Sequence, residues 1–435
     1  MTDQPDRVRG DRTGIDIPAH EPALREGGAD WLTRAFQAFG AMSKGNRVTQ
    51  VVECREFLGG GSGAKAMLKL TYAQPEPELH ETLFVKFSRN YADPAGDRAR
   101  FYMETEVRFA ALSHIPGFPI NVPHCQFADY HHESGTGVII THVIPFGEGA
   151  VEPQLEKCSD DTMTDVIGHY RALILALADL AGNFKGGKLP AEFAEAFPWD
   201  RKTAMSRDRL PCTPEQLQRR VARYAQFAED VPQLLPEAIR TPQFIASLGE
   251  GAELFRANED AIKQIHHADE GMHSLVHWNA NSDNAWYWRD ETGTLQCGLF
   301  DWGGVGQHHL AMCLWGCLSS ADQDLWHDHL DELLSFFVAE YAASGGPQID
   351  VAELRLHLQL YVGTMGLCWL MDAPPRIRGA VPDIADCETR MDPRILANET
   401  ARVQLQMMSN FLCFWEASDL TNKLKSQFEP AHIRT

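Results

Sequence analysis

Two polar segments in the middle of the chain hold the residue types that metal-assisted chemistry on phosphate requires. His277 and Asn284 lie seven residues apart in SLVHWNANSDNAWYW (274–288), and Asp301 follows Asn284 after a further seventeen residues, in LFDWGG. Both polar segments adjoin strand-like runs, so an amide and a carboxylate are expected at the mouths of neighbouring strands. Such oxygen ligands can hold Mg²⁺ together with phosphate oxygens, because a hard cation prefers hard oxygen donors.

The centre of the first segment departs from what proton transfer needs. Asn279 stands two residues after His277, where a carboxylate would act as general base, and a carboxamide cannot accept a proton. Its carbonyl oxygen can still accept a hydrogen bond and orient a hydroxyl group. General-base catalysis is worth about 10²–10⁴-fold. Asp283 is the nearest substitute carboxylate, although it is adjacent to Asn284 and more simply read as a solvent-facing residue.

The amino-terminal part supplies candidates for binding phosphate. A glycine turn between two strand-like runs would let backbone amides approach phosphate oxygens, although a plain hairpin turn explains the same composition. The turn comprises Gly59, Gly60, Gly61, Ser62 and Gly63. Lys86 lies in the apolar run LFVKFS, and a helix carboxylate could pair with its ammonium group. Glu106 is preferred as that partner because it precedes VRF on the apolar stripe, and Glu104 is the alternative.

Periodicity assigns these residues to an α+β fold with two lobes. A flexible tail is expected over residues 1–28, and a small antiparallel sheet of five strands with one inserted helix over 29–145. The remainder, 146–435, is expected to form a mainly helical lobe that carries the catalytic loop, the metal site and the acceptor site. Its few strand patterns occur near SLVH, NAWYW and LQCGLFDW. The predicted strands and helices of the first lobe are a helix over 30–39, strands over 47–57, 64–72 and 81–88, a helix over 98–115, and strands over 122–132 and 138–144.

Composition excludes several classes of protein. The 435 residues carry a formal charge of −21, which should repel nucleic acid and anionic membranes. No apolar run approaches the length of a membrane span, and no apolar leader segment follows the amino terminus. The ten cysteines have no repeating spacing, so we expect reduced thiols and a cytoplasmic protein. The histidine pairs match no zinc-ligand spacing.

These motifs, taken in order, resemble the aminoglycoside phosphotransferase-like and ecdysteroid-kinase-like small-molecule kinases, which have a protein-kinase-like fold. The matching residues are Trp31-Leu32, GGGSG (59–63), Lys86, ETEVRFAALSHIPGFPINVPHCQFADY (104–130), HWNANSDN (277–284) and GLFDWG (298–303). The resemblance implies a two-lobed kinase fold that binds ATP and Mg²⁺ and phosphorylates a small hydroxylated substrate. It further implies that Lys86 contacts phosphates, that Glu106 holds Lys86, and that Asn284 and Asp301 bind the metal.

The chain departs from that family pattern at three positions. The family loop reads His-Gly-Asp, whereas this chain has His277-Trp278-Asn279, so both the glycine and the catalytic carboxylate are replaced. Downstream, an Asp-Leu-Ala that is common in the family is His309-Leu310-Ala311 here. Two functions therefore remain open. One is an ATP-dependent kinase acting on a small-molecule hydroxyl and weakened at Asn279; the other is a pseudokinase-like protein that binds nucleotide or ligand and has a regulatory role. The sequence indicates neither the acceptor nor the oligomeric state.

Overall fold

The computed structural model describes residues 6–57, 63–94, 96–207 and 209–428. The chain divides into two compact units. The first unit comprises residues 1–153, 189–198 and 286–306, and the second comprises residues 154–188, 199–285 and 307–435. The segment around LFDWGG, which we expected in the helical lobe, therefore belongs to the unit that contains the five-stranded sheet.

A five-stranded antiparallel sheet organises the first unit, which confirms the expected α+β class. Its strand order is β3-β4-β5-β7-β6. The strands are β3 (Val48–Phe57), β4 (Lys65–Tyr72), β5 (Thr82–Phe87), β6 (Cys125–His131) and β7 (Thr136–His142). In the β4–β5 register Lys65 lies directly opposite Lys86, and in the β5–β7 register Lys86 lies opposite Ile139. Lys86 is thus on a central strand, with a neighbouring strand on each side.

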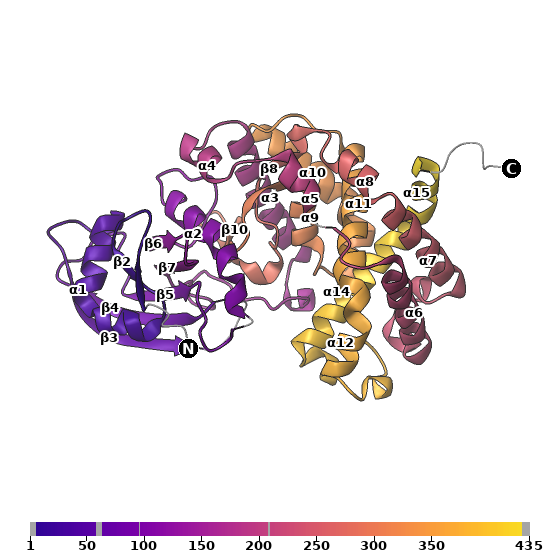
Figure 1. Ribbon diagram of the computed structural model, residues 1–435, viewed down its shortest axis with the longest axis horizontal. Coiled ribbons are helices and arrows are strands. Elements are labelled where there is room, and N and C mark those ends of the chain that lie inside the picture. The colour runs from indigo at the N-terminus through magenta and orange to yellow at the C-terminus, as the bar shows by residue number, and fades with distance from the viewer. Residues whose placement is uncertain (1–5, 58–62, 95, 208, 429–435) are drawn as a thin grey trace. The chain divides into compact units, whose positions relative to one another are not determined.

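Each face of this sheet is covered by one helix, because apolar residues alternate along the strands. Ala66, Leu68 and Leu70 of β4 are buried in a core with α1 (Glu21–Phe39), which Figure 1 shows in indigo against the sheet. The opposite face packs against α2 (Met103–Leu112), which buries Met103 and Val107 there. By the alternation of side chains along the strands, Lys65 and Lys86 lie on this second face, the one that carries α2.

The amino-terminal segment is ordered over residues 6–28, so the expectation of a flexible tail is wrong there. It forms a small hairpin of β1 (Arg7–Arg9) and β2 (Asp16–Pro18), and α1 begins at Glu21. The buried carboxylate of Asp129 accepts the backbone N–H groups of Arg12 (3.0 Å) and Thr13 (2.9 Å). Composition alone does not reveal this partner, because it lies more than a hundred residues away.

A second hairpin completes the first unit and carries the metal-site candidate Asp301. It is formed by β9 (Ala285–Arg289) and β10 (Leu295–Leu299), as expected from NAWYW and LQCGL. Two isolated bridges attach it, one between Asn121 and Gly298 and the other between Val151 and Trp288. The short helix α4 (Ala191–Ala196) adds Phe193, whose ring stacks on that of Phe118 at 5.8 Å.

The second unit is mainly helical, also as expected. Its strands are β8 (His273–Val276), which matches the SLVH pattern, and β11 (Gly306–His309), which the sequence did not suggest; the two pair with each other. None of the helices within the described ranges is long and apolar enough to cross a membrane. The helices are α3 (Val166–Lys185), α5 (Arg201–Ser206), α6 (Pro214–Asp230), α7 (Pro242–Ala257), α8 (Glu259–His266), α9 (Leu310–Leu318), α10 (Leu330–Ala343), α11 (Val351–Trp369), α12 (Ala373–Ala380), α13 (Pro393–Leu396), α14 (Glu399–Ala417) and α15 (Leu420–Phe428).

Candidate functional site

Lys86 is the centre of the candidate site in the first unit. Its Nζ donates hydrogen bonds to both carboxylate oxygens of Glu106, each at 2.9 Å, and to Oδ1 of Asp301 at 2.6 Å. Burial by itself would lower the pKa of Lys86, but the two carboxylates outweigh it and raise the pKa above its ordinary value. The ammonium group is therefore kept charged and held in one position.

The structure distinguishes the two candidate partners of Lys86. Glu106 lies on the buried face of α2 together with Met103 and Val107, at helical spacings of three and four residues. Glu104 instead forms ion pairs with Arg108 and, at 2.9 Å, with Nδ1 of His132. The structure therefore places Glu106, the preferred candidate, and not Glu104, in contact with Lys86.

Asp301 reaches Lys86 from a short turn that begins just after β10. It has a left-handed backbone conformation, with φ of 60°, which is unusual for a residue other than glycine. The next residue, Trp302, donates from Nε1 to the carbonyl of Leu299 at 3.0 Å and stacks on Phe109 of α2 with ring centroids 4.0 Å apart. Because α2 also carries Glu106, this helix supports both carboxylates that contact Lys86.

Only the last residue of the glycine turn lies within the described residues. Gly59, Gly60, Gly61 and Ser62 are outside them. Gly63 has φ of +84°, and a Cβ atom added to it would lie 2.1 Å from the carbonyl oxygen of Phe87. Glycine is therefore required at this position on two grounds, the backbone conformation and the close approach to the end of β5. The end of the glycine turn therefore lies against Phe87, the residue that follows Lys86 in β5.

Lys65 also belongs to this site, and the sequence reasoning missed it. It lies directly opposite Lys86, so both side chains leave the same face of the sheet. Burial and the nearby positive charge of Lys86 lower the pKa of Lys65, whereas the charges of Asp301 and Glu106 act in the opposite direction. Strand alternation alone assigns Lys65 to one of the two faces of β4, and the β4–β5 register that places it opposite Lys86 was not predicted from the sequence.

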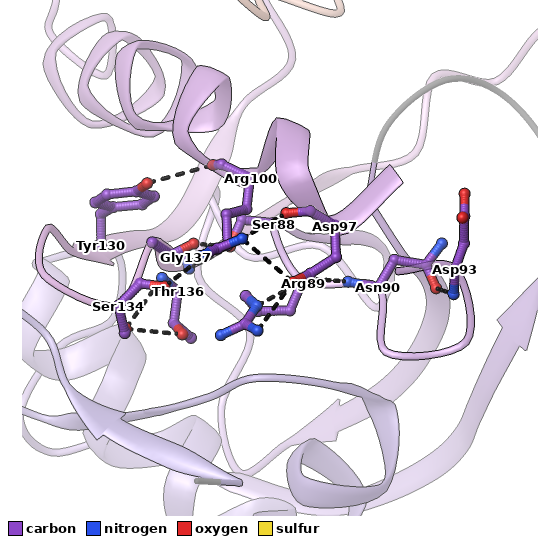
Figure 2. Close-up of polar contacts among 11 residues, drawn as sticks. Ser88, Arg89, Asn90, Asp93, Asp97, Arg100, Tyr130, Ser134, Thr136 and Gly137 are labelled. Carbon is purple, nitrogen blue, oxygen red and sulfur yellow. Dashed lines mark hydrogen bonds and ion pairs between the residues drawn. The ribbon is translucent and has the colours of Figure 1, made fainter. Parts of the chain in front are cut away.

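A buried ion pair holds the segment that leads from β5 into α2. Figure 2 shows Arg89, Asp97 and Arg100 turned toward one another. Arg89 binds Asp97 through two parallel hydrogen bonds, Nε to Oδ1 at 2.8 Å and Nη2 to Oδ2 at 3.0 Å. Asp97 lies in the 3₁₀-helix η1 (Gly96–Tyr102), which runs directly into α2 at Met103. Burial raises the pKa of Asp97. The hydrogen bonds from Arg89 and from the Asn90 backbone, with the charges of Arg89 and Arg100, outweigh burial and lower this pKa overall.

The loop that carries His277, Asn279 and Asn284 lies in the second unit, whose boundary falls just after Ala285, the first residue of β9. The backbone N–H of Asn279 donates to Nδ1 of His277 at 3.2 Å. The Asn279 side-chain oxygen accepts from Nδ2 of Asn281 at 2.8 Å, and the Asn279 backbone carbonyl accepts from Nδ2 of Asn284 at 2.8 Å. The structure thus brings these three predicted residues together in one hydrogen-bonded loop.

Trp278 and His309, the two other departures from the family pattern, each have a structural explanation. A Cβ atom added to Gly316 of α9 would lie 1.9 Å from the carbonyl oxygen of Trp278, so a glycine on the helix gives room for the loop backbone. His309, at the position of the missing downstream carboxylate, caps α9 by accepting the N–H of Ala311 at 2.9 Å. The other ring nitrogen of His309 lies 2.8 Å from Nδ1 of His357. This histidine therefore has a structural role at the start of α9.

Asp283, the conceivable substitute base, is engaged in an ion pair. Its Oδ2 lies 3.6 Å from Nζ of Lys157, and its side chain is 24% exposed. Asp283 is thus neither fully solvated, as the simplest expectation had it, nor free of a positive neighbour that favours its charged form.

The chemistry of Asn284 and Asp301 fits a magnesium ion. The amide nitrogen of Asn284 is directed to the Asn279 carbonyl, and no described residue donates a hydrogen bond to its side-chain oxygen. Asp301 offers a carboxylate that is 43% exposed. Both supply the hard oxygen atoms that Mg²⁺ prefers. Asn284 belongs to the second unit and Asp301 to the first.

Comparison with known proteins identifies only distant similarities. No family model matches the chain, and no curated protein matches it. The microcompartment-associated aminopropanol kinase is 14% identical over 90% of this chain and 99% of its own, with a TM-score of 0.45. A spectinomycin phosphotransferase, solved with ADP and spectinomycin, is 11% identical over 85% and 94%, with a TM-score of 0.41. A choline kinase from Cryptosporidium parvum Iowa II is 12% identical over 85% and 90%, with a TM-score of 0.40. At such identities and TM-scores, no activity, substrate or residue role transfers to this chain.

Proposed function

We propose that the chain is an ATP-dependent phosphotransferase that acts on a hydroxyl group of a small molecule, weakened by Asn279. The observation that carries the proposal is the contact of Lys86 with two carboxylates, Glu106 and Asp301. A lysine held in this way is a fixed positive charge suited to binding a phosphate group. Phosphoryl transfer needs this kind of positioning and charge neutralisation more than it needs covalent chemistry from the protein.

The proposed roles follow from the chemistry of each group. Lys86 binds nucleotide phosphate oxygens, and Glu106 keeps the Lys86 ammonium group charged and oriented. Asn284 and Asp301 hold Mg²⁺, which supplies neutralisation of phosphate charge when it is bound. Gly63 keeps the end of the glycine turn close to the end of β5.

On the acceptor side, Asn279 orients the hydroxyl group and cannot remove its proton. Loss of a general base lowers the rate by about 10²–10⁴-fold, whereas positioning and electrostatic stabilisation remain. We therefore expect slow transfer at neutral pH, with the Asn279→Asp variant faster than the wild type.

Nucleotide binding is tested by thermal unfolding at increasing concentrations of ATP with Mg²⁺. A ligand that binds the native state raises the unfolding temperature, by an amount that grows with its concentration. We expect stabilisation of the wild type at millimolar nucleotide and a much smaller effect in Lys86→Met. If the wild type shows no stabilisation, the proposal is wrong.

A second function, nucleotide binding without transfer, is favoured by one observation. The residue at the base position is a carboxamide whose side-chain oxygen is already bonded to Asn281. ATP turnover over a panel of hydroxylated metabolites separates the two functions, with wild type, Asp301→Asn and Asn279→Asp compared at equal nucleotide saturation. Wild-type turnover that disappears in Asp301→Asn supports the enzyme, whereas turnover that is found only in Asn279→Asp supports the binding protein.

A further inference from the structure

Helix α6 carries three arginines along one side of an open hollow in the second unit. The hollow has a volume of about 620 Å³ and is lined mainly by α6, together with Asp372 at the end of the 3₁₀-helix η8 (Leu370–Asp372). Figure 1 shows α6 and α12, which follows η8, in the same part of this unit, and the two helices are in contact. Arg223 follows Arg219 by four residues and Arg220 by three, which places all three arginines on one face of the helix. A cationic helix face therefore borders the hollow.

The carboxylate of Asp372 already binds to this face. Its Oδ1 accepts a hydrogen bond from Nη2 of Arg223 at 2.6 Å, and its Oδ2 lies 2.6 Å from Nη2 of Arg220. Nη1 of Arg220 also donates to the backbone carbonyl oxygens of Leu367 and Cys368, at 3.1 and 3.2 Å, near the end of α11. Arg220 is thus fixed by protein groups, whereas the side chain of Arg223 is 49% exposed and faces a ligand more readily.

Positive charge exceeds negative charge around the hollow. Three arginines and one aspartate are the charged groups among its described lining residues. Glu215, one turn before Arg219 on α6, interacts with the charge of Arg219 and accepts the hydroxyl group of Thr213 at 2.7 Å. Further along the same face, Asp230 is paired with Arg378. Even with Glu215 included, three positive charges face two negative ones, in a chain whose formal charge is −21. An anion is therefore attracted to this hollow although the surface as a whole repels it.

We propose that this hollow is a binding site for a small phosphate monoester, whose phosphate group lies between Arg219 and Arg223. Guanidinium groups match the geometry of phosphate oxygens and bind them through charge-assisted hydrogen bonds. Side chains one helical turn apart are neighbours, so both arginines can contact the same phosphate group. The site uses none of the residues assigned above to nucleotide or metal binding, and the inference does not depend on the proposed function.

Calorimetric titration with glycerol 3-phosphate, without nucleotide and at low salt, tests the site. Arg219→Gln and Arg223→Gln each remove one charge and keep a polar side chain. Arg240→Gln, at an exposed arginine that does not line the hollow, is the matched control. We expect each of the first two variants to weaken binding about tenfold, the size of one charge-assisted hydrogen bond, while Arg240→Gln stays within about threefold of the wild type.

Asp372→Asn distinguishes a direct role of charge from damage to the fold. This variant removes the internal carboxylate that competes with the ligand for Arg223, so the attraction on a phosphate group increases. We expect binding of glycerol 3-phosphate to become about tenfold tighter, the size of one charge-assisted hydrogen bond. Loss of structure cannot produce such a gain. A folded Asp372→Asn protein that binds no more tightly than the wild type would overturn the proposal.

Two further arms identify the ligand class and the location. Succinate carries its two charges on separate carboxylates, which cannot both lie between the same two arginines, so it should bind more weakly than glycerol 3-phosphate. Lys86→Met should leave the affinity for glycerol 3-phosphate unchanged, because Lys86 lies in the first unit.

Four results would overturn the inference. They are no binding of glycerol 3-phosphate at millimolar concentration, succinate binding at least as tightly, a loss of affinity in Arg240→Gln equal to that in Arg223→Gln, and a loss confined to Lys86→Met. None of them contradicts nucleotide binding at Lys86, which the thermal unfolding with Mg²⁺ and ATP tests separately.

Discussion

A buried lysine is stable only when its charge is compensated, and Lys86 meets this condition twice. Its side chain is 10% exposed, and three carboxylate oxygens lie within 2.9 Å of Nζ. Removing one partner of such a buried pair leaves an uncompensated charge, which is more costly than the loss of an exposed ion pair. The two glutamates of α2 therefore provide a direct comparison between a buried and a partly exposed carboxylate.

Glu106→Gln should reduce the free energy of unfolding by about 3 kcal/mol, since it removes one of two charges that compensate Lys86. Glu104→Gln, whose partners Arg108 and His132 are exposed, should reduce it by less than about 1 kcal/mol. Urea unfolding at pH 7.5, followed by tryptophan fluorescence, measures both variants. Similar losses in the two variants would contradict the assignment of Glu106 as the buried partner.

Among the elements of the first unit, α2 contributes several of the contacts around Lys86 and Asp301. It carries Glu106, which contacts Lys86, and Phe109, which stacks on Trp302 next to Asp301. The helix is also continuous with η1, and Arg89, just after β5, binds Asp97 of η1. Position and rotation of this one helix therefore determine whether both carboxylates reach Lys86. We predict that the Arg89–Asp97 pair positions the site through α2, because the hydrogen bonds observed for the pair among the described residues do not involve Lys86.

A double-mutant cycle of Arg89→Met and Asp97→Asn tests this coupling. Each single variant should lower the free energy of unfolding by about 3 kcal/mol, and the double variant should lose clearly less than the sum. Amide hydrogen exchange in 103–112 should accelerate in each single variant, because the amino-terminal anchor of α2 is loosened. Arg98→Met, an exposed arginine in the same 3₁₀-helix, serves as the control. Additive losses, or exchange in α2 equal to that of the wild type, would show that the pair does not position the helix.

On the scale of the molecule, a cluster of buried histidines from distant parts of the chain lies in the second unit. They are His266, His267, His273, His309 and His357. Burial is the largest cause of their lowered pKa values, with the pKa of His273 at about 4 and that of His267 at about 3. They contact one another in pairs, for example His267 Nδ1 with His273 Nε2 at 2.8 Å. The folded unit therefore keeps these side chains uncharged.

Because the folded-state pKa values lie below those of unfolded histidine, acid should destabilise the second unit. The full stability is present above about pH 6.5 and is lost as the pH falls toward 4, by about 1.4 kcal/mol per pH unit for each histidine that is protonated only on unfolding. Urea midpoints at pH 7.5, 6.0 and 5.0 measure this slope.

A pair of variants assigns that slope to the buried histidines. His267→Gln, which keeps a hydrogen-bonding group, should reduce the slope by the contribution of about one proton. His327→Gln should not reduce the slope, because the hydrogen bond with Asp328 raises the pKa of this exposed histidine and gives it the opposite pH dependence. Equal stability at pH 7.5 and 5.0 would contradict the prediction.

Local patterns were sufficient for most of the elements. Strand alternation and helical spacing placed the five strands of the sheet, the helix that carries Glu106, and the strands on both sides of DETGT, because those patterns depend on residues only a few positions apart. They failed at residues 6–28, which are polar and short in large apolar side chains. That segment is fixed by Asp129, a partner on a distant strand.

The sequence by itself determined the α+β class, the five-stranded sheet, and the kind of chemistry that Lys86, Asn279, Asn284 and Asp301 can perform, because residue type and local periodicity depend on the chain alone. Tertiary structure decided which carboxylates hold Lys86. Glu106 and Glu104 are two residues apart, and only the rotation of α2 against the sheet separates them; Asp301 is 215 residues beyond Lys86. It also brought Lys65 next to Lys86, since strand register, and not sequence distance, determines which side chains are neighbours.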